Sequence, residues 1–93
     1  PKAITTATDV HGLGTVLYAL LAGHAPFRGE SPLEIIEQVR TRPPEPPRRA
    51  APDRRVDRDL EAIALKALEK EPSRRYGSAE ALADDLERWL AGK

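Results

Sequence analysis

The segment from Asp9 to Ala22 predicts a helix that is apolar on nearly every side. Asp9 or Thr8 can cap its start, and Gly23 supplies the left-handed residue that commonly ends a helix. Large apolar side chains are spread around the helical wheel at Val10, Leu13, Val16, Leu17, Tyr18, Leu20 and Leu21. Such a helix belongs in the interior of a protein, surrounded by other elements. A chain of 93 residues has too few other elements to surround it.

A second helix has clear start signals, whereas residues 1–8 have no helical or strand period and predict an entering loop. Ser31 is the expected N-cap and Pro32 takes the first helical position. Glu34 completes a capping box, in which two side chains satisfy the free N–H groups of the first turn. This helix is expected to end near Arg40, before a run of prolines.

Two more helices are predicted in the second half of the chain. One begins at Asp57 or Asp59 and ends near Lys70, with a 3.6-residue apolar stripe formed by Leu60, Ile63, Ala64, Ala67 and Leu68. The other is capped by Ser78 and ends near Ala91, with Leu82, Leu86, Trp89 and Leu90 on one face. The sequence contains no strand pattern, so the predicted fold class is all-α.

Residues 42–56 form a loop rich in proline and arginine. Its prolines disfavour helix and sheet and predict extended, polyproline-like backbone. The sequence here fits two proline motifs that aromatic-lined domains bind, but a solvated connecting loop is the preferred interpretation. Seven arginines from Arg40 to Arg58 against three acids make a local basic patch without interleaved aromatic residues.

Composition excludes several classes of function. Fifteen basic and fifteen acidic residues balance, so no net charge attracts nucleic acid or an anionic membrane. Cysteine is absent, which excludes disulfides, thiolate metal sites and cysteine nucleophiles. The most apolar stretch, residues 13–22, is too short to cross a membrane, and no signal peptide is visible. A cytoplasmic location is therefore expected.

Short matches to catalytic motifs fail on their context. Residues 12–14 resemble the start of a dinucleotide-binding motif, but no strand precedes them, so we interpret the glycines as sites of close helix packing. Residues 29–33 lack the second glycine of a nucleophile elbow. His11 and His24 have no metal-ligand spacing and are interpreted as ordinary structural or surface histidines. The acids at 84–87 are interpreted as a solvated helix face.

Two motifs, in this order along the chain, resemble the eukaryotic-type Ser/Thr protein kinases. The segment TDVHGLGTVLYALLAG at residues 8–23, followed by Ala-Pro-Phe at 25–27, resembles the central buried helix of their large lobe. The segment EPSRRY at residues 71–76 resembles the D-P-x-x-R-[YW] motif near the end of the same fold. The proline-rich loop and the alanine and arginine bias are most similar to bacterial members.

The resemblance implies roles for three residues. Asp9 matches the buried aspartate that accepts N–H bonds from the catalytic loop, and Gly14 matches a small residue that permits close packing. Arg75 matches the arginine that pairs with a glutamate at the end of the activation segment. The chain departs from the family pattern at His11 (usually Trp or Tyr), Gly12 (usually Ser) and Glu71 (usually Asp).

The resemblance also implies what the chain is and what it lacks. Residues 1–93 would be the C-terminal helices of a kinase large lobe, with residues 42–56 as a loop within it and an α+β parent domain. The parent would be an ATP- and Mg²⁺-dependent Ser/Thr kinase acting on a protein substrate. The chain has no Gly-rich loop, catalytic-loop Asp and Asn, or Asp-Phe-Gly motif, so alone it is expected to bind no cofactor and to be inactive.

Two other classes of protein remain as alternatives: a non-catalytic helical interaction module and a helix-turn-helix DNA binder. The candidate recognition helices at 31–40 and 79–91 are acidic on balance, which disfavours DNA. As a kinase fragment, the chain is expected to have helix content without a cooperative melt and to self-associate through its apolar helix. Its expected partner is the remainder of the kinase domain, and the parent could itself be membrane-anchored with this part in the cytoplasm.

Overall fold

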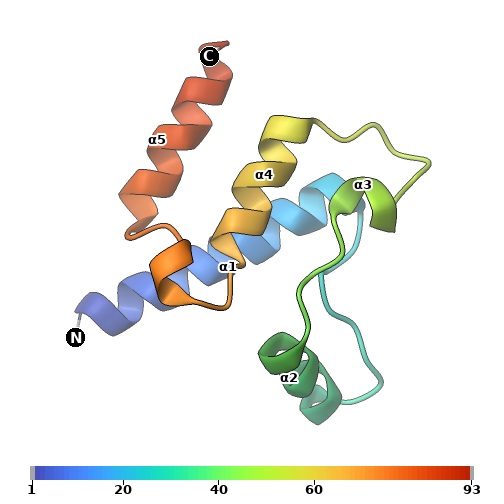
Figure 1. The fold of residues 1–93 in the computed structure, drawn as a ribbon. Coiled ribbons are helices and arrows are strands. Elements are labelled where there is room, and N and C mark those ends of the chain that lie inside the picture. Colours follow the sequence, from blue (N-terminus) through green and yellow to red (C-terminus); the bar gives the residue numbers. More distant parts are fainter. Residues whose placement is uncertain (1, 93) are drawn as a thin grey trace.

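Residues 2–92 fold into five α-helices and one short 3-10 turn in the computed structural model (Figure 1). The structure describes the backbone of these residues and the side chains of residues 10–71 and 73–92. The elements are α1 (Lys2–Ala22), α2 (Pro32–Thr41), α3 (Pro47–Ala50), α4 (Arg58–Ala67), the 3-10 turn η1 (Pro72–Arg74) and α5 (Ala79–Leu90). No strand occurs in residues 2–92, and the all-α prediction is confirmed.

Helix α1 begins at Lys2, so the prediction of an entering loop over residues 1–8 is wrong for residues 2–8, and residue 1 lies outside the described part. No proline or glycine interrupts residues 2–11, and a threonine or isoleucine costs a helix only a few tenths of a kcal/mol relative to alanine. Asp9 therefore lies inside the helix and is not its cap. The predicted end is confirmed, because Gly23 has a φ of 84° and its N–H donates to the Ala19 carbonyl at 2.8 Å.

The predicted N-caps of α2 and α5 are present, and α4 is capped by Asp57, one of its two predicted starting residues. The side chains of Ser31, Asp57 and Ser78 each accept a hydrogen bond from the backbone N–H three residues later, at 3.2, 3.0 and 3.1 Å. In the capping box of α2, the Glu34 carboxylate reaches back to the N–H of Glu30 rather than to that of Ser31. These short-range contacts fix where each helix starts.

The loop at residues 42–56 is more ordered than the proline pattern predicts. Pro47 starts the one-turn helix α3, because proline at the first helical position loses no hydrogen bond and already has a helical φ. Pro47 and Ala51 are buried, and α3 packs against α1. The expectation of a wholly extended, solvated loop is therefore wrong for its central turn.

The core lies where α4 crosses α1 and where α5 and α3 pack beside this pair. One group of buried residues joins α1, α4 and α5: Val10, Ile63, Ala67, Tyr76 and Leu82. A second group joins α1, the end of α4 and the loop: Tyr18, Ala22, Ala51 and Leu68. The molecule measures 41 × 40 × 17 Å, so it is a thin layer in which α1 is covered on one side only.

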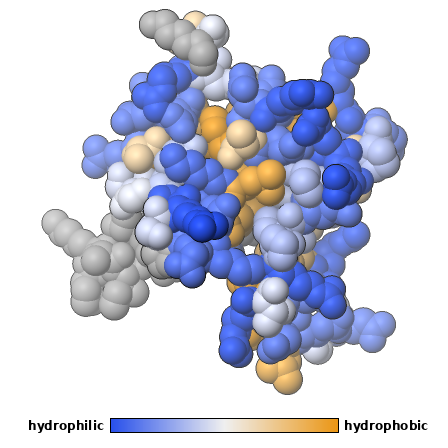
Figure 2. All heavy atoms as spheres, in the orientation of Figure 1, coloured by the Kyte–Doolittle hydropathy of each residue, from blue (hydrophilic) through white to orange (hydrophobic). Residues whose placement is uncertain are grey.

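Apolar side chains remain on the surface of this layer. The exposed fractions of Leu13, Val16 and Leu20 on α1 are 45%, 58% and 70%. Helix α2 lies apart from the other helices in Figure 1 and has no buried residue. In the same orientation, Figure 2 shows hydrophobic side chains in the middle of the face and at its lower end, where α2 lies. Among residues 2–92, no helix is long and apolar enough to cross a membrane.

Candidate functional site

Gly14 lies in close contact with the end of α4. A Cβ atom at this position would lie 2.6 Å from the Cβ of Ala67 and 3.3 Å from Cδ2 of Leu68. Real Cβ atoms do not approach other carbon atoms so closely, so any side chain larger than hydrogen would push the helices apart. Gly12, one helical half-turn away, has nothing within 4 Å of the same ideal Cβ. Close helix packing therefore depends on Gly14 and not on Gly12.

Arg75 closes the turn between α4 and α5. Its Nε donates to the Glu69 carbonyl at 2.8 Å, and an Nη donates to the Lys70 carbonyl at 3.3 Å. Among the side chains of residues 10–71 and 73–92, no carboxylate pairs with this half-buried guanidinium. A guanidinium has five N–H donors, so these two bonds leave donors for a further acceptor.

Asp9, the third residue that the resemblance singles out, lies in α1, but its side chain is outside the described part of the structure. His11, two residues further along α1, is half-buried. Burial lowers the pKa of His11, and the positive charges of Arg75 and Lys70 lower it further. The described surroundings of His11 are thus cationic and favour its neutral form.

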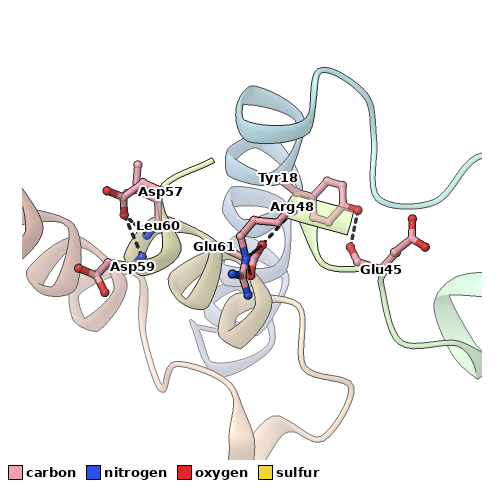
Figure 3. A network of polar contacts seen from close by, with 7 residues as sticks. All are labelled: Tyr18, Glu45, Arg48, Asp57, Asp59, Leu60 and Glu61. Atoms are coloured by element: carbon pink, nitrogen blue, oxygen red, sulfur yellow. Dashed lines mark hydrogen bonds and ion pairs between the residues drawn. The ribbon is translucent and has the colours of Figure 1, made fainter. Parts of the chain in front are cut away.

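An ion pair between the buried Glu61 and the more exposed Arg48 joins the proline-rich loop to α4 (Figure 3). Glu61 is only 5% exposed, and one carboxylate oxygen accepts the backbone N–H of Arg48 at 2.9 Å. The other oxygen accepts Nε of Arg48 at 3.0 Å. The sequence signal is weak, since it consists only of an acid within the apolar stripe of α4. Buried carboxylates require partners of this kind, so Glu61 fixes the position of α3.

Tyr18 provides a second tie between α1 and the same loop (Figure 3). Its hydroxyl donates to the Glu45 carbonyl at 2.5 Å, and its ring is 1% exposed. Arg54, also from this loop, donates from Nε to the Leu21 carbonyl at 3.0 Å and so satisfies the C-terminal end of α1. The loop is held by these contacts, and Pro47, which belongs to one of the two proline motifs, is buried.

The sequence predicts that the acidic face of α5 is solvated. In the structure, part of this face is instead engaged in contacts within the protein. Asp85 accepts a hydrogen bond from the Tyr76 hydroxyl at 2.6 Å and a second one from Arg88. Lys66 lies over the Tyr76 ring, 4.4 Å from its centroid. Burial and the bond to Asp85 raise the pKa of Tyr76. This cluster therefore fastens α5 to the turn that precedes it, and it acts in packing rather than in acid–base chemistry.

An apolar hollow of about 330 Å³ lies between α1 and α5. We call it the α1/α5 face; its lining residues are Leu13, Val16, Leu17, Leu20, Ala79, Leu82, Ala83 and Leu86. None of these residues is polar or charged. Among the described residues, no group of three His, Cys, Asp or Glu side chains is placed to hold a metal ion. The described helices thus offer an apolar surface for packing between α1 and α5.

Comparison with known proteins relates the chain to bacterial kinases. It is 40% identical over 92 residues to the serine/threonine-protein kinase PknB of Mycolicibacterium smegmatis, which covers 99% of this chain and 14% of the relative. It is 40% identical over 86 residues to PknB of Mycobacterium tuberculosis, with 92% and 13% covered. It is also 38% identical over 90 residues to the tyrosine-protein kinase MasK of Myxococcus xanthus, with 97% and 14% covered.

No protein-family model matches the chain. The chain spans only about one-seventh of the length of these relatives. Since the identity nonetheless extends over nearly all of its residues, the chain is homologous to a short segment of bacterial protein kinases of the PknB type.

Proposed function

We propose that this chain is the C-terminal, helical part of the large lobe of a bacterial Ser/Thr protein kinase. Its role there is to form the scaffold on which the catalytic parts of the domain are assembled. The single observation that carries the proposal is that one apolar side of α1 is exposed to solvent, although the opposite side packs tightly against α4. The homology over 99% of the chain to a segment of PknB supports the same assignment.

The energetics of α1 favour a covering partner. Burying a leucine or valine side chain fully stabilises a protein by about 1.5–3 kcal/mol. Leu13, Val16 and Leu20 are each between 45% and 70% exposed and forfeit a corresponding part of this stabilisation. The whole stability of a small domain is about 5 kcal/mol, so three such residues matter. A self-contained interaction module would also expose an apolar groove, so it is the homology to a segment of PknB that leads us to favour the remainder of a kinase domain as the partner.

Within this proposal, three residues have scaffold roles. Gly14 permits the close crossing of α1 and α4, as its distance to Ala67 suggests. Arg75, with donors to spare beyond its two carbonyl contacts, receives the carboxylate of a glutamate from the activation segment. Asp9 accepts N–H bonds from the catalytic loop. All three bind parts of the domain and none of them touches substrate.

Phosphate transfer itself depends on groups outside these 93 residues. Bound ATP supplies the phosphoryl group, and Mg²⁺ neutralises its charge. The described residues have neither a Gly-rich phosphate loop nor a carboxylate cluster, so they do not fit either group. Both would be held by the rest of the parent domain. The acceptor is a protein serine or threonine by likeness to PknB, and the parent domain would work in the cytoplasm.

Two observations test this function. The coding sequence upstream of Pro1 is expected to encode an Ala-Pro-Glu-like segment preceded by catalytic-loop motifs; an in-frame stop codon with no kinase motif beyond it would contradict the proposal. The purified chain is expected to show no magnesium-dependent phosphate transfer to a generic protein substrate. Transfer above that of a mock preparation would show that the chain is more than a scaffold.

A further inference from the structure

Helix α2 lies beside the packed helices without being buried against them (Figure 1). A hollow of about 420 Å³ lies between its C-terminal end and α4, lined by Thr41, Pro43 and Pro44 on one side and by Leu65 and Leu68 on the other. Burial of apolar side chains, which fixes α1 against α4, therefore contributes little to the position of α2. Specific polar contacts have to supply what packing does not.

The last turn of α2 contains a carbonyl group that its own backbone cannot satisfy. In a continued α-helix the Val39 carbonyl would accept the N–H of residue 43, but residue 43 is proline and has no N–H. Lys70, three residues beyond the end of α4, supplies the missing donor, since its Nζ donates to the Val39 carbonyl at 2.5 Å. The same ammonium lies 5.1 Å from the centroid of the Phe27 ring, in the loop before α2. One side chain thus contacts both the last turn of α2 and the segment that leads into it.

We propose that Lys70 is a positioning residue that holds α2 in place through its ammonium group. The positive charge lies at the C-terminal end of α2, where the helix dipole favours a cation, and the face of the Phe27 ring attracts it as well. Arg75 holds the backbone of the same residue, because its Nη donates to the Lys70 carbonyl at 3.3 Å. Among residues 10–71 and 73–92, the bond from Lys70 to Val39 is the only hydrogen bond that joins α2 to α1, α4, α5 or the turn between α4 and α5.

The inference goes beyond the proposed function, because it assigns what fixes α2 and not which catalytic parts the scaffold carries. The test is hydrogen exchange, measured by mass spectrometry on the complete product of the gene, so that every part that packs against this chain is present. Lys70→Met keeps an unbranched apolar stem but removes the donor. The α2 amides are then expected to exchange about 10-fold faster, at the low end for a charged hydrogen bond because Lys70 is only half-buried.

Two further variants separate this role from a general loss of stability. Lys70→Arg keeps a charged donor and is expected to keep most of the protection of α2. Lys66→Met is the matched control, because Lys66 lies one turn earlier and its ammonium is 4.4 Å from the centroid of the Tyr76 ring, on the α5 side. It is expected to leave exchange in α2 unchanged.

Faster exchange confined to α2 in Lys70→Met, with protection kept in Lys70→Arg and in Lys66→Met, supports the proposal. Wild-type exchange of α2 in Lys70→Met overturns it, as does equally faster exchange in α2 and α4 of that variant. An equal effect of Lys66→Met on α2, or a loss of protection in Lys70→Arg as large as in Lys70→Met, also overturns it. Phosphate transfer is not the readout, so the role of Lys70 and the kinase assignment can fail independently.

Discussion

Replacing Gly14 by alanine tests the close contact between α1 and α4. The new Cβ would lie 2.6 Å from the Cβ of Ala67. Ala67 is fully buried, and its Cβ is bonded directly to the backbone of α4, so no side-chain rotation can relieve the clash. Overpacking of this kind destabilises a core by about 1–3 kcal/mol. Alanine also favours a helix over glycine by about 1 kcal/mol. The net expected loss for Gly14→Ala is therefore about 1 kcal/mol.

Gly12→Ala is the matched control, because it gains the same helix propensity while its Cβ meets nothing within 4 Å. The two variants are thus expected to differ by about 1–3 kcal/mol, with Gly12→Ala the more stable. Amide hydrogen exchange in α1 and α4 measures this difference locally, without requiring a cooperative transition of the whole chain. If Gly14→Ala is as stable as Gly12→Ala, the helices do not pack as described.

Three further predictions concern buried polar groups. Glu61→Ala removes the hydrogen bonds to the backbone and side chain of Arg48 and is expected to lower the free energy of unfolding by about 2 kcal/mol. This lies at the low end for charged hydrogen bonds because the Arg48 side chain is 47% exposed. An unchanged hydrogen-exchange rate of the Arg48 amide would refute this prediction. The pKa values of Tyr18 and Tyr76 are raised, chiefly by burial, so the neutral form is favoured in the folded chain. The stability that these two side chains contribute is therefore retained up to about pH 10 and falls as the pH rises further. Tyrosinate absorbance is expected only above this pH. Titration of both tyrosines at the ordinary pKa would contradict the packing. The pKa of His11 is lowered, so its contribution to stability is complete above about pH 6.5 and declines below it. Arg75→Gln should move that pKa upward in an NMR titration, and no movement would show that Arg75 does not act on His11.

Local features of the fold could be predicted because they depend on residues close together in sequence. The caps at Ser31, Asp57 and Ser78 satisfy N–H groups within three residues. The end of α1 depends only on the positive φ that Gly23 adopts. The apolar stripe of α4 likewise depends on one helical period. The start of α1 could not be predicted in this way, because weak helix formers are tolerated when nothing interrupts the helix.

Contacts between distant residues have at most a weak sequence signal. Glu61 looks like any surface acid until α3 brings the Arg48 N–H against it across 13 residues of chain. Tyr18 was counted among the apolar residues of α1, and its hydroxyl partner, Glu45, lies 27 residues further on. The special role of Gly14 relative to Gly12 also required the position of Ala67. Such pairings depend on the crossing of helices, which propensity and periodicity do not specify.

The most direct test of the scaffold assignment is to graft the chain into a related kinase. The homologous segment of 92 residues in PknB of Mycolicibacterium smegmatis would be replaced by this chain, and transfer of phosphate from Mg²⁺-ATP to a protein substrate would be measured. We expect the chimera to fold and to keep its activity, and a Gly14→Phe chimera, with a far larger side chain against Ala67, to lose it. A chimera that is unfolded, or one that is folded but inactive, would contradict the claim that this chain is the scaffold of a kinase lobe.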